Sequence, residues 1–123
     1  MNGKTACLLI ALGLLCDPAN ASIYPVSGRW TYDNASAPGA ATSCGERYME
    51  FRAAQRFDTE GGVSKLRNVS VTGTPPTWRV VDEFFNVMIR GRVSYILRLA
   101  DEDHIEVRYL QGGERILLRR CEH

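Results

Sequence analysis

Histidine is scarce in this 123-residue sequence, which contains only His104 and His123. A histidine-based triad needs a histidine next to a nucleophile and an acid, and no motif around these two residues supplies that pattern. An excess of charge of one sign is also lacking, because the formal net charge is +1 at pH 7. This balance predicts neither a nucleic-acid interface nor strong attraction to an anionic membrane. We therefore expect a protein that is not an enzyme and that needs no metal or cofactor.

Long hydrophobic runs are missing too, apart from one at residues 6–16. Lys4 precedes this run and Ala19-Asn20-Ala21 follows it with the small residues of a cleavage site, so residues 1–21 are predicted to be a signal peptide. The run is too short to span a bilayer, and no later segment is long or apolar enough. Residues 22–123 are therefore predicted to form one exported domain, periplasmic or secreted, with no membrane span.

Cysteine is equally sparse after the predicted signal, where only Cys44 and Cys121 remain. A pair of cysteines in an exported chain is typical of a disulfide, which would help to stabilise a domain of this small size. The competing interpretation, a catalytic thiol, requires a nearby base and a reducing compartment. We expect the disulfide.

Alternating apolar residues dominate the remainder of the sequence, and Gly, Pro or acidic clusters interrupt them about every ten residues. This pattern predicts an all-β fold, a small antiparallel meander that closes into a barrel of seven or eight strands with one disulfide. The seven predicted strands cover residues 28–33, 47–57, 63–72, 77–85, 88–100, 104–110 and 114–121.

The clearest predicted hairpin turns at residues 101–103. It pairs Leu99 with Ile105 on the inner face and Arg98 with Glu106 on the outer face, and a slip by one residue would bring Leu against a charge. The next hairpin is predicted to turn at Gly112-Gly113 and to pair Tyr109 with Ile116. In this register Arg120 points inward.

Upstream, the same reasoning brings Arg67 opposite Asp82, and Asp82 opposite Gly91, on the predicted inner face. Phe84 then pairs with Ile89. Two interpretations stay open: Arg67, Asp82, Phe84 and Ile89 form the mouth of a small-ligand site, or the charges form a solvated ion pair at a barrel rim.

Gly28-x-Trp30 on the first predicted strand, with Arg120 on the last one, resembles the pattern of lipocalins and related calycins. An arginine can lie flat on an indole ring and close one end of a barrel, so the resemblance implies a structural plug made of Gly28, Trp30 and Arg120. It also implies a barrel that binds a small molecule. The large aromatic residues of the predicted interior favour a filled barrel instead.

The chain also resembles, more distantly, the small exported barrels that inhibit bacterial metalloproteases. That resemblance implies that residues 22–26, before the first strand, act as an inhibitory arm, with Ser22 and Ile23 leading. The overall expectation is an exported non-enzymatic binding or structural protein of lipocalin-like type. The alternatives are a periplasmic protease inhibitor and a carrier of a small apolar ligand, so the expected partner is a small apolar ligand or a secreted protease.

Overall fold

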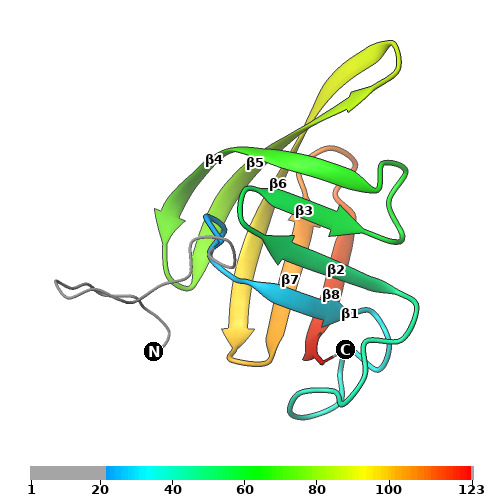
Figure 1. Cartoon of the computed structure of the whole chain (residues 1–123). Coiled ribbons are helices and arrows are strands. Elements are labelled where there is room, and N and C mark those ends of the chain that lie inside the picture. Colours follow the sequence, from blue (N-terminus) through cyan, green and yellow to red (C-terminus); the bar gives the residue numbers. More distant parts are fainter. Residues whose placement is uncertain (1–21, 123) are drawn as a thin grey trace, which may run out of the picture.

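The computed structural model describes residues 22–122, so the predicted signal peptide at residues 1–21 lies outside the described residues. The described chain is a meander of antiparallel strands (Figure 1). Within it, no helix is long and apolar enough to cross a membrane. The strands are β1 (Gly28–Thr31), β2 (Tyr48–Arg52), β3 (Gln55–Asp58), β4 (Lys65–Thr74), β5 (Thr77–Asn86), β6 (Ile89–Asp101), β7 (His104–Tyr109) and β8 (Arg115–Cys121).

These eight strands form a closed barrel in chain order, and β1 pairs with β8 to complete it. The predicted fold class is therefore confirmed. The predicted strand at residues 47–57 is two strands, β2 and β3, which pair with each other across a tight turn. Ala53, at this turn, has a φ of 53°, a left-handed conformation that alanine adopts rarely. No Gly, Pro or Asn marks the turn in the sequence, which is why the strand was predicted as continuous.

Of the four predicted hairpin registers, one is correct and three are shifted. Leu99 pairs with Ile105 and Arg98 with Glu106, as predicted. Elsewhere the pairing is displaced by two residues, and Ile116, for example, pairs with Val107 instead of Tyr109. A two-residue slip keeps side chains on their predicted faces, so the hydrophobic pattern does not exclude it. The start of β4 is the exception, because a bulge between Asn68 and Ser70 shifts the pairing there by one residue. The lengths of the turns decide the register.

The barrel interior is filled by apolar side chains at the end where the chain starts and finishes. Tyr24 and Val26, which precede β1, are buried in this core, and Tyr24 packs edge-on against Phe51 at a ring distance of 5.0 Å. Residues 22–26 therefore belong to the barrel. The fully buried side chains around them include Trp30, Met49, Val80, Leu97, Ile105, Val107 and Leu118.

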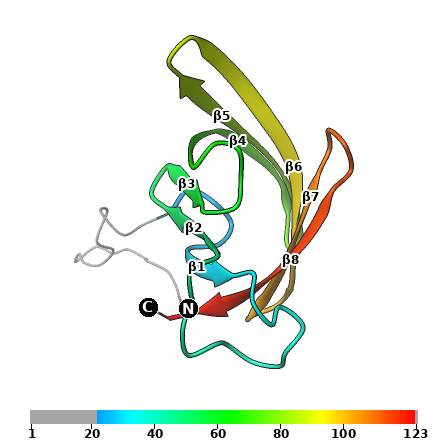
Figure 2. The same cartoon turned by 90° about the vertical axis from the view of Figure 1, so that its right-hand side faces the viewer.

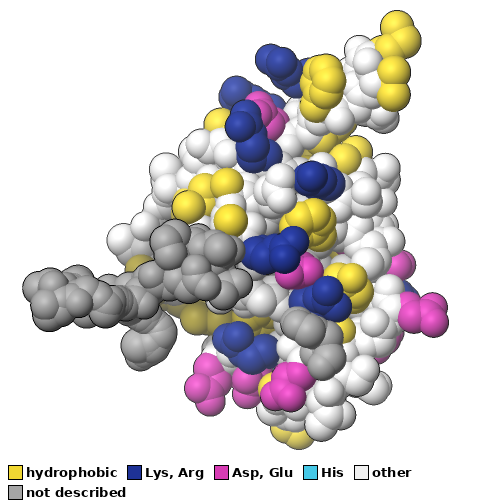
Figure 3. Space-filling model, in the orientation of Figure 1, with side chains coloured by type: hydrophobic (Ala, Val, Ile, Leu, Met, Phe, Trp, Pro, Cys, Tyr) yellow, Lys and Arg dark blue, Asp and Glu magenta, His cyan; other side chains and the backbone are white. Residues whose placement is uncertain are grey.

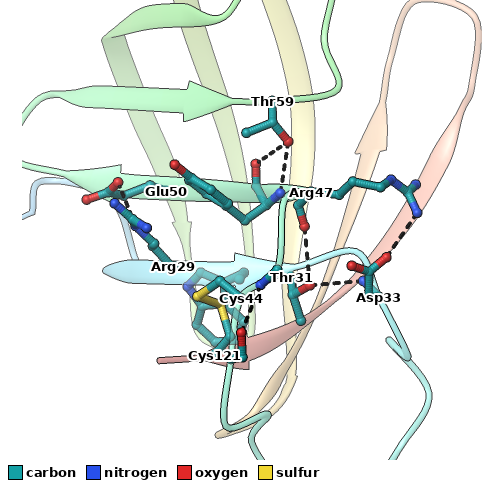
Figure 4. Close-up of a disulfide and its surroundings, with 12 residues drawn as sticks. Arg29, Thr31, Asp33, Cys44, Arg47, Glu50, Thr59 and Cys121 are labelled. Carbon is teal, nitrogen blue, oxygen red and sulfur yellow. Dashed lines mark hydrogen bonds and ion pairs between the residues drawn. A yellow bond between two sulfur atoms is a disulfide. The ribbon is translucent and has the colours of Figure 1, made fainter. Parts of the chain in front are cut away.

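The same end of the barrel is closed by Trp30 and by the disulfide. The Arg120 guanidinium lies 4.4 Å from the centre of the Trp30 ring, and the indole N–H donates to the carbonyl of Ser27. Cys44 and Cys121 form the predicted disulfide, with Cα atoms 5.0 Å apart (Figure 4). Ala41 pairs with Cys121 in parallel, so the long β1–β2 connection folds back along β8 and brings Cys44 to its partner.

Candidate binding site

A buried ion pair lies inside the barrel. Arg56 of β3 and Asp82 of β5 are 2 % and 0 % exposed, and the Arg56 Nε atom is 2.7 Å from Asp82 Oδ2. A buried charge is tolerated only when it is paired and its remaining hydrogen-bonding positions are filled. The surroundings of Asp82 meet that requirement.

Among the described residues, three further donors reach the Asp82 carboxylate. The hydroxyl of Tyr24 donates to Oδ1 at 2.9 Å, that of Tyr95 donates to Oδ2 at 2.8 Å, and Asn68 Nδ2 donates to Oδ1 at 3.2 Å. Both carboxylate oxygens thus accept two hydrogen bonds each. Both oxygens are fully hydrogen-bonded, so Asp82 stabilises the barrel and has no free acceptor position for a ligand.

The ionisation of these groups follows from their burial. Burial and the negative charge of Asp82 raise the pKa of Tyr24, and burial raises the pKa of Tyr95 well above its usual range. Burial acts to lower the pKa of Arg56, but the surrounding tyrosines and Asp82 outweigh it, so that pKa is raised. At neutral pH the guanidinium is therefore charged and both phenols are neutral donors.

Asp58 is a second buried carboxylate, 4 % exposed, and its two oxygens differ. Oδ1 accepts hydrogen bonds from the Tyr32 hydroxyl at 2.6 Å and from the backbone N–H of Glu60 at 2.9 Å. Oδ2 lies 3.7 Å from Arg56 Nη1, beyond hydrogen-bond distance, and no donor from residues 22–122 reaches it. Arg56 thus forms ion pairs with both carboxylates, but its hydrogen bond goes to Asp82 alone. Asp58 Oδ2 is thus a buried acceptor with unused capacity.

A cavity of about 710 Å³ opens beside Asp58, at the end of the barrel opposite Trp30, and we call it the mouth cavity. It lies between the β3–β4 and β7–β8 connections, with Arg56, Asp58 and Tyr109 among its lining residues. Gly61 borders it, and a Cβ atom there would come within 3.1 Å of Asp58 Oδ2. A side chain at Gly61 would therefore crowd this oxygen. The apolar residues that line the cavity are Val63, Leu66, Val93, Ile116 and Leu117.

The structure does not bring the four residues of the predicted ligand mouth together. Arg67 is exposed and pairs with Glu83 at 2.7 Å instead of Asp82, because a bulge between Asn68 and Ser70 shifts the register. Phe84 pairs with Gly91, and Ile89 lies at the exposed β5–β6 turn. Asp82 is buried beneath them. Neither interpretation of an Arg67–Asp82 pair therefore holds.

Arg56 and Asp58 were not predicted as interior residues because of the unpredicted β2–β3 turn. A continuous strand with Phe51 inside would place Phe57 inside and Arg56 outside, by simple alternation. The turn changes this parity, since Phe51 pairs with Arg56 and Met49 with Asp58. The alternation of Arg56 and Asp58 themselves was the one signal available, and it is typical of an exposed strand face.

Residues 22–26, the predicted inhibitory arm, are packed rather than free. The backbone N–H of Ile23 donates to the carbonyl of Ala53, and Ser22 Oγ bonds to the backbone of Tyr24 and Val26. Only Ile23 projects, with 57 % of its surface exposed.

No group of three or more metal-ligating side chains is found in the part of the chain that the structure describes. His104 instead joins two loops: Nδ1 lies 2.8 Å from Asp101 Oδ1 and Nε2 lies 2.7 Å from the carbonyl oxygen of Ala37. Both partners are acceptors, so the doubly protonated ring satisfies both contacts.

Comparison of the chain with protein-family models, curated proteins and solved structures finds no significant match.

Proposed function

We propose that this protein is an exported, non-enzymatic binding protein of lipocalin-like type. Its ligand is a small amphiphilic molecule that carries an ammonium or other strong hydrogen-bond donor. The single observation that carries the proposal is Asp58 Oδ2, a buried carboxylate oxygen at the mouth cavity that no described donor reaches within hydrogen-bond distance. A buried acceptor without a partner is unfavourable, and a ligand donor relieves that cost.

The remaining lining suits the rest of such a molecule. The phenol rings of Tyr32 and Tyr109 border the cavity, and an ammonium group is attracted to aromatic faces. Leu66, Val93 and Ile116 offer apolar walls for a short hydrocarbon chain. Small-molecule sites usually have mostly apolar walls and a few polar groups that fix the orientation of the ligand.

Export and the lipocalin-like resemblance support a binding role without specifying the ligand. The Gly28-x-Trp30 motif with Arg120 across the indole is the arrangement that the resemblance implies. The inhibitor alternative has less support, because the segment that would act as its arm buries Tyr24 and Val26 in the barrel core. A purely apolar ligand also has less support, because it would leave Asp58 Oδ2 without a donor.

The proposal is tested with three eight-carbon probes, octylammonium, octanoate and 1-octanol, by isothermal titration calorimetry on the disulfide-bonded chain of residues 22–123. We expect octylammonium to bind most tightly. Asp58→Asn should weaken its binding at least tenfold, because a charge-assisted hydrogen bond contributes about 1.5 to 3 kcal/mol. Glu83→Gln, which removes a charge outside the mouth cavity, is the matched control and should change affinity much less.

Gly61→Ala supplies a variant that leaves all charges in place. Its methyl group would crowd Asp58 Oδ2, so it should also weaken octylammonium binding. Circular dichroism and thermal melts establish that each variant is folded. Equal binding of the three probes, or octylammonium binding that Asp58→Asn leaves unchanged, would refute the proposal.

A further inference from the structure

The hairpin of β5 and β6 extends beyond the barrel wall as a two-stranded projection (Figures 1 and 2). The pairing of β5 with β4 ends at Glu83, and the pairing of β6 with β7 ends at Tyr95. Residues 84–91 therefore pair only with each other, and we call them the finger. Such a ribbon has no core of its own to bury its apolar side chains.

The end of the finger is apolar and exposed. Val87 and Met88 at the turn are 89 % and 90 % exposed, and the adjacent Phe85 and Ile89 are 74 % and 61 % exposed. In the space-filling view, hydrophobic side chains gather at the far end of the projection (Figure 3). Single exposed apolar residues are ordinary, but a contiguous group of this kind marks an interaction site.

The backbone at the end of the finger is already hydrogen-bonded in part. Asn86 pairs with Ile89 across the turn, and the backbone N–H of Val87 donates to Asn86 Oδ1 at 2.6 Å. Polar backbone groups without partners are the main obstacle to entering hydrocarbon. These internal bonds reduce that obstacle, so the turn is suited to a shallow apolar environment.

Basic side chains gather on one side of the finger and its base. Lys65, Arg67 and Arg90 line a groove of about 400 Å³ together with Phe84 and Phe85. Arg92 is also exposed, opposite Glu83 in the ladder. Glu83 is the single acidic residue of the groove, and Arg67 already neutralises it at 2.7 Å. We call Lys65, Arg67, Arg90 and Arg92 the basic collar.

We propose that the finger inserts its tip into an anionic phospholipid bilayer, while the basic collar binds the lipid headgroups. The net charge of +1 does not predict this, but the charge is unevenly distributed. An apolar tip next to a group of cations matches the layering of a bilayer, with hydrocarbon beneath a negatively charged surface. A narrow convex tip fits such a surface better than it fits the flat, broad patch typical of a stable protein interface.

The experiment uses the disulfide-bonded chain of residues 22–123 and vesicles of phosphatidylcholine, with or without phosphatidylglycerol, in a co-sedimentation assay. We expect binding to the anionic vesicles that is at least tenfold tighter than to neutral ones and that weakens as salt is raised. The double variant Val87→Ser, Met88→Ser and the double variant Arg90→Gln, Arg92→Gln should each lower the bound fraction at least tenfold.

Matched controls separate the finger from the general surface. Leu110→Ser removes an exposed apolar side chain at the β7–β8 turn, and Arg108→Gln removes an exposed charge on β7. Neither variant should alter vesicle binding. Val87→Trp adds a fluorescent probe to the tip, whose emission should shift to the blue on binding anionic vesicles.

Two results would overturn the proposal. One is a wild-type protein that does not bind anionic vesicles more tightly than neutral ones. The other is vesicle binding that the tip variant retains. If the tip variant abolishes a concentration-dependent self-association seen by analytical ultracentrifugation while vesicles are not bound, the finger contacts a second copy of the chain and not a membrane.

Discussion

The substitution Asp82→Asn tests whether the buried ion pair holds the barrel together. It keeps the size and shape of the side chain and removes the negative charge that faces Arg56. In the native protein each carboxylate oxygen accepts two hydrogen bonds. The amide can accept at only one of these positions. If its oxygen turns toward Arg56, its NH₂ group meets the Asn68 amide and the Tyr24 hydroxyl, and only the hydroxyl can rotate to accept.

The expected magnitude follows from this loss. Removing one partner of a buried ion pair costs about 3 to 5 kcal/mol, because the other charge is left buried and unpaired. Small domains have a total stability of about 5 to 15 kcal/mol, so the loss is a large fraction of it. For a domain of about 100 residues it corresponds to a fall in Tm of about 15 to 30 °C.

The assay is thermal and urea denaturation at pH 7, followed by circular dichroism, with the disulfide intact. Glu83→Gln is the matched control, since it removes the adjacent carboxylate on the outer face, where solvent screens the pair with Arg67. We expect the control to leave Tm nearly unchanged.

The double variant Arg56→Met, Asp82→Asn distinguishes an ion pair from simple packing. It removes both charges, so it should be clearly more stable than the sum of the two single losses predicts. Additive losses, or a single Asp82→Asn variant with wild-type stability, would show that the pair does not carry this energy.

Two further predictions concern the loops at the Trp30 end. The hydrogen bond to Asp101, followed by that to Ala37, raises the pKa of His104, so its stabilising effect is full below the unfolded pKa of about 6.5 and is lost as pH rises through the folded pKa. The difference in unfolding free energy between wild type and His104→Gln should therefore be larger at pH 5.5 than at pH 8.5, and an equal difference at both values contradicts this. The disulfide closes a sequence separation of 77 residues, so the Cys44→Ser, Cys121→Ser variant should lose about 4 kcal/mol, measured by urea denaturation. An unchanged urea midpoint would contradict that estimate.

The β6–β7 hairpin shows where sequence pattern suffices. A one-residue slip there would bury a charge against a leucine, so the alternation alone selects the pairing of Leu99 with Ile105. The β5–β6 hairpin shows where it does not. A two-residue slip keeps Phe84 on its face, and the turn at Val87-Met88 places Gly91, not Ile89, beneath the Phe84 ring.

The lining of the mouth cavity depends on the β2–β3 turn, where the sequence has no Gly, Pro or Asn to indicate a turn. Ala53 adopts a left-handed backbone without glycine, and this changes which side of β3 faces inward. A strand that carries Arg56 and Asp58 on one face is ordinarily read as exposed. Only the closed barrel, which surrounds that face on all sides, makes these charges buried and brings them to the cavity.

The sequence by itself determined the all-β meander and the disulfide, because alternation and cysteine number constrain them directly. The contact of Arg120 with Trp30 was implied by the resemblance to lipocalins and related calycins. The predicted signal peptide and export also come from the sequence and remain predictions. The tertiary structure alone decided which buried polar residues meet, because Tyr24, Arg56 and Asp82 come from separate segments of the chain, where a two-residue shift or one turn changes each neighbour. It also decided that Val87 and Met88 project into solvent, since the apolar pattern cannot show where the barrel wall ends.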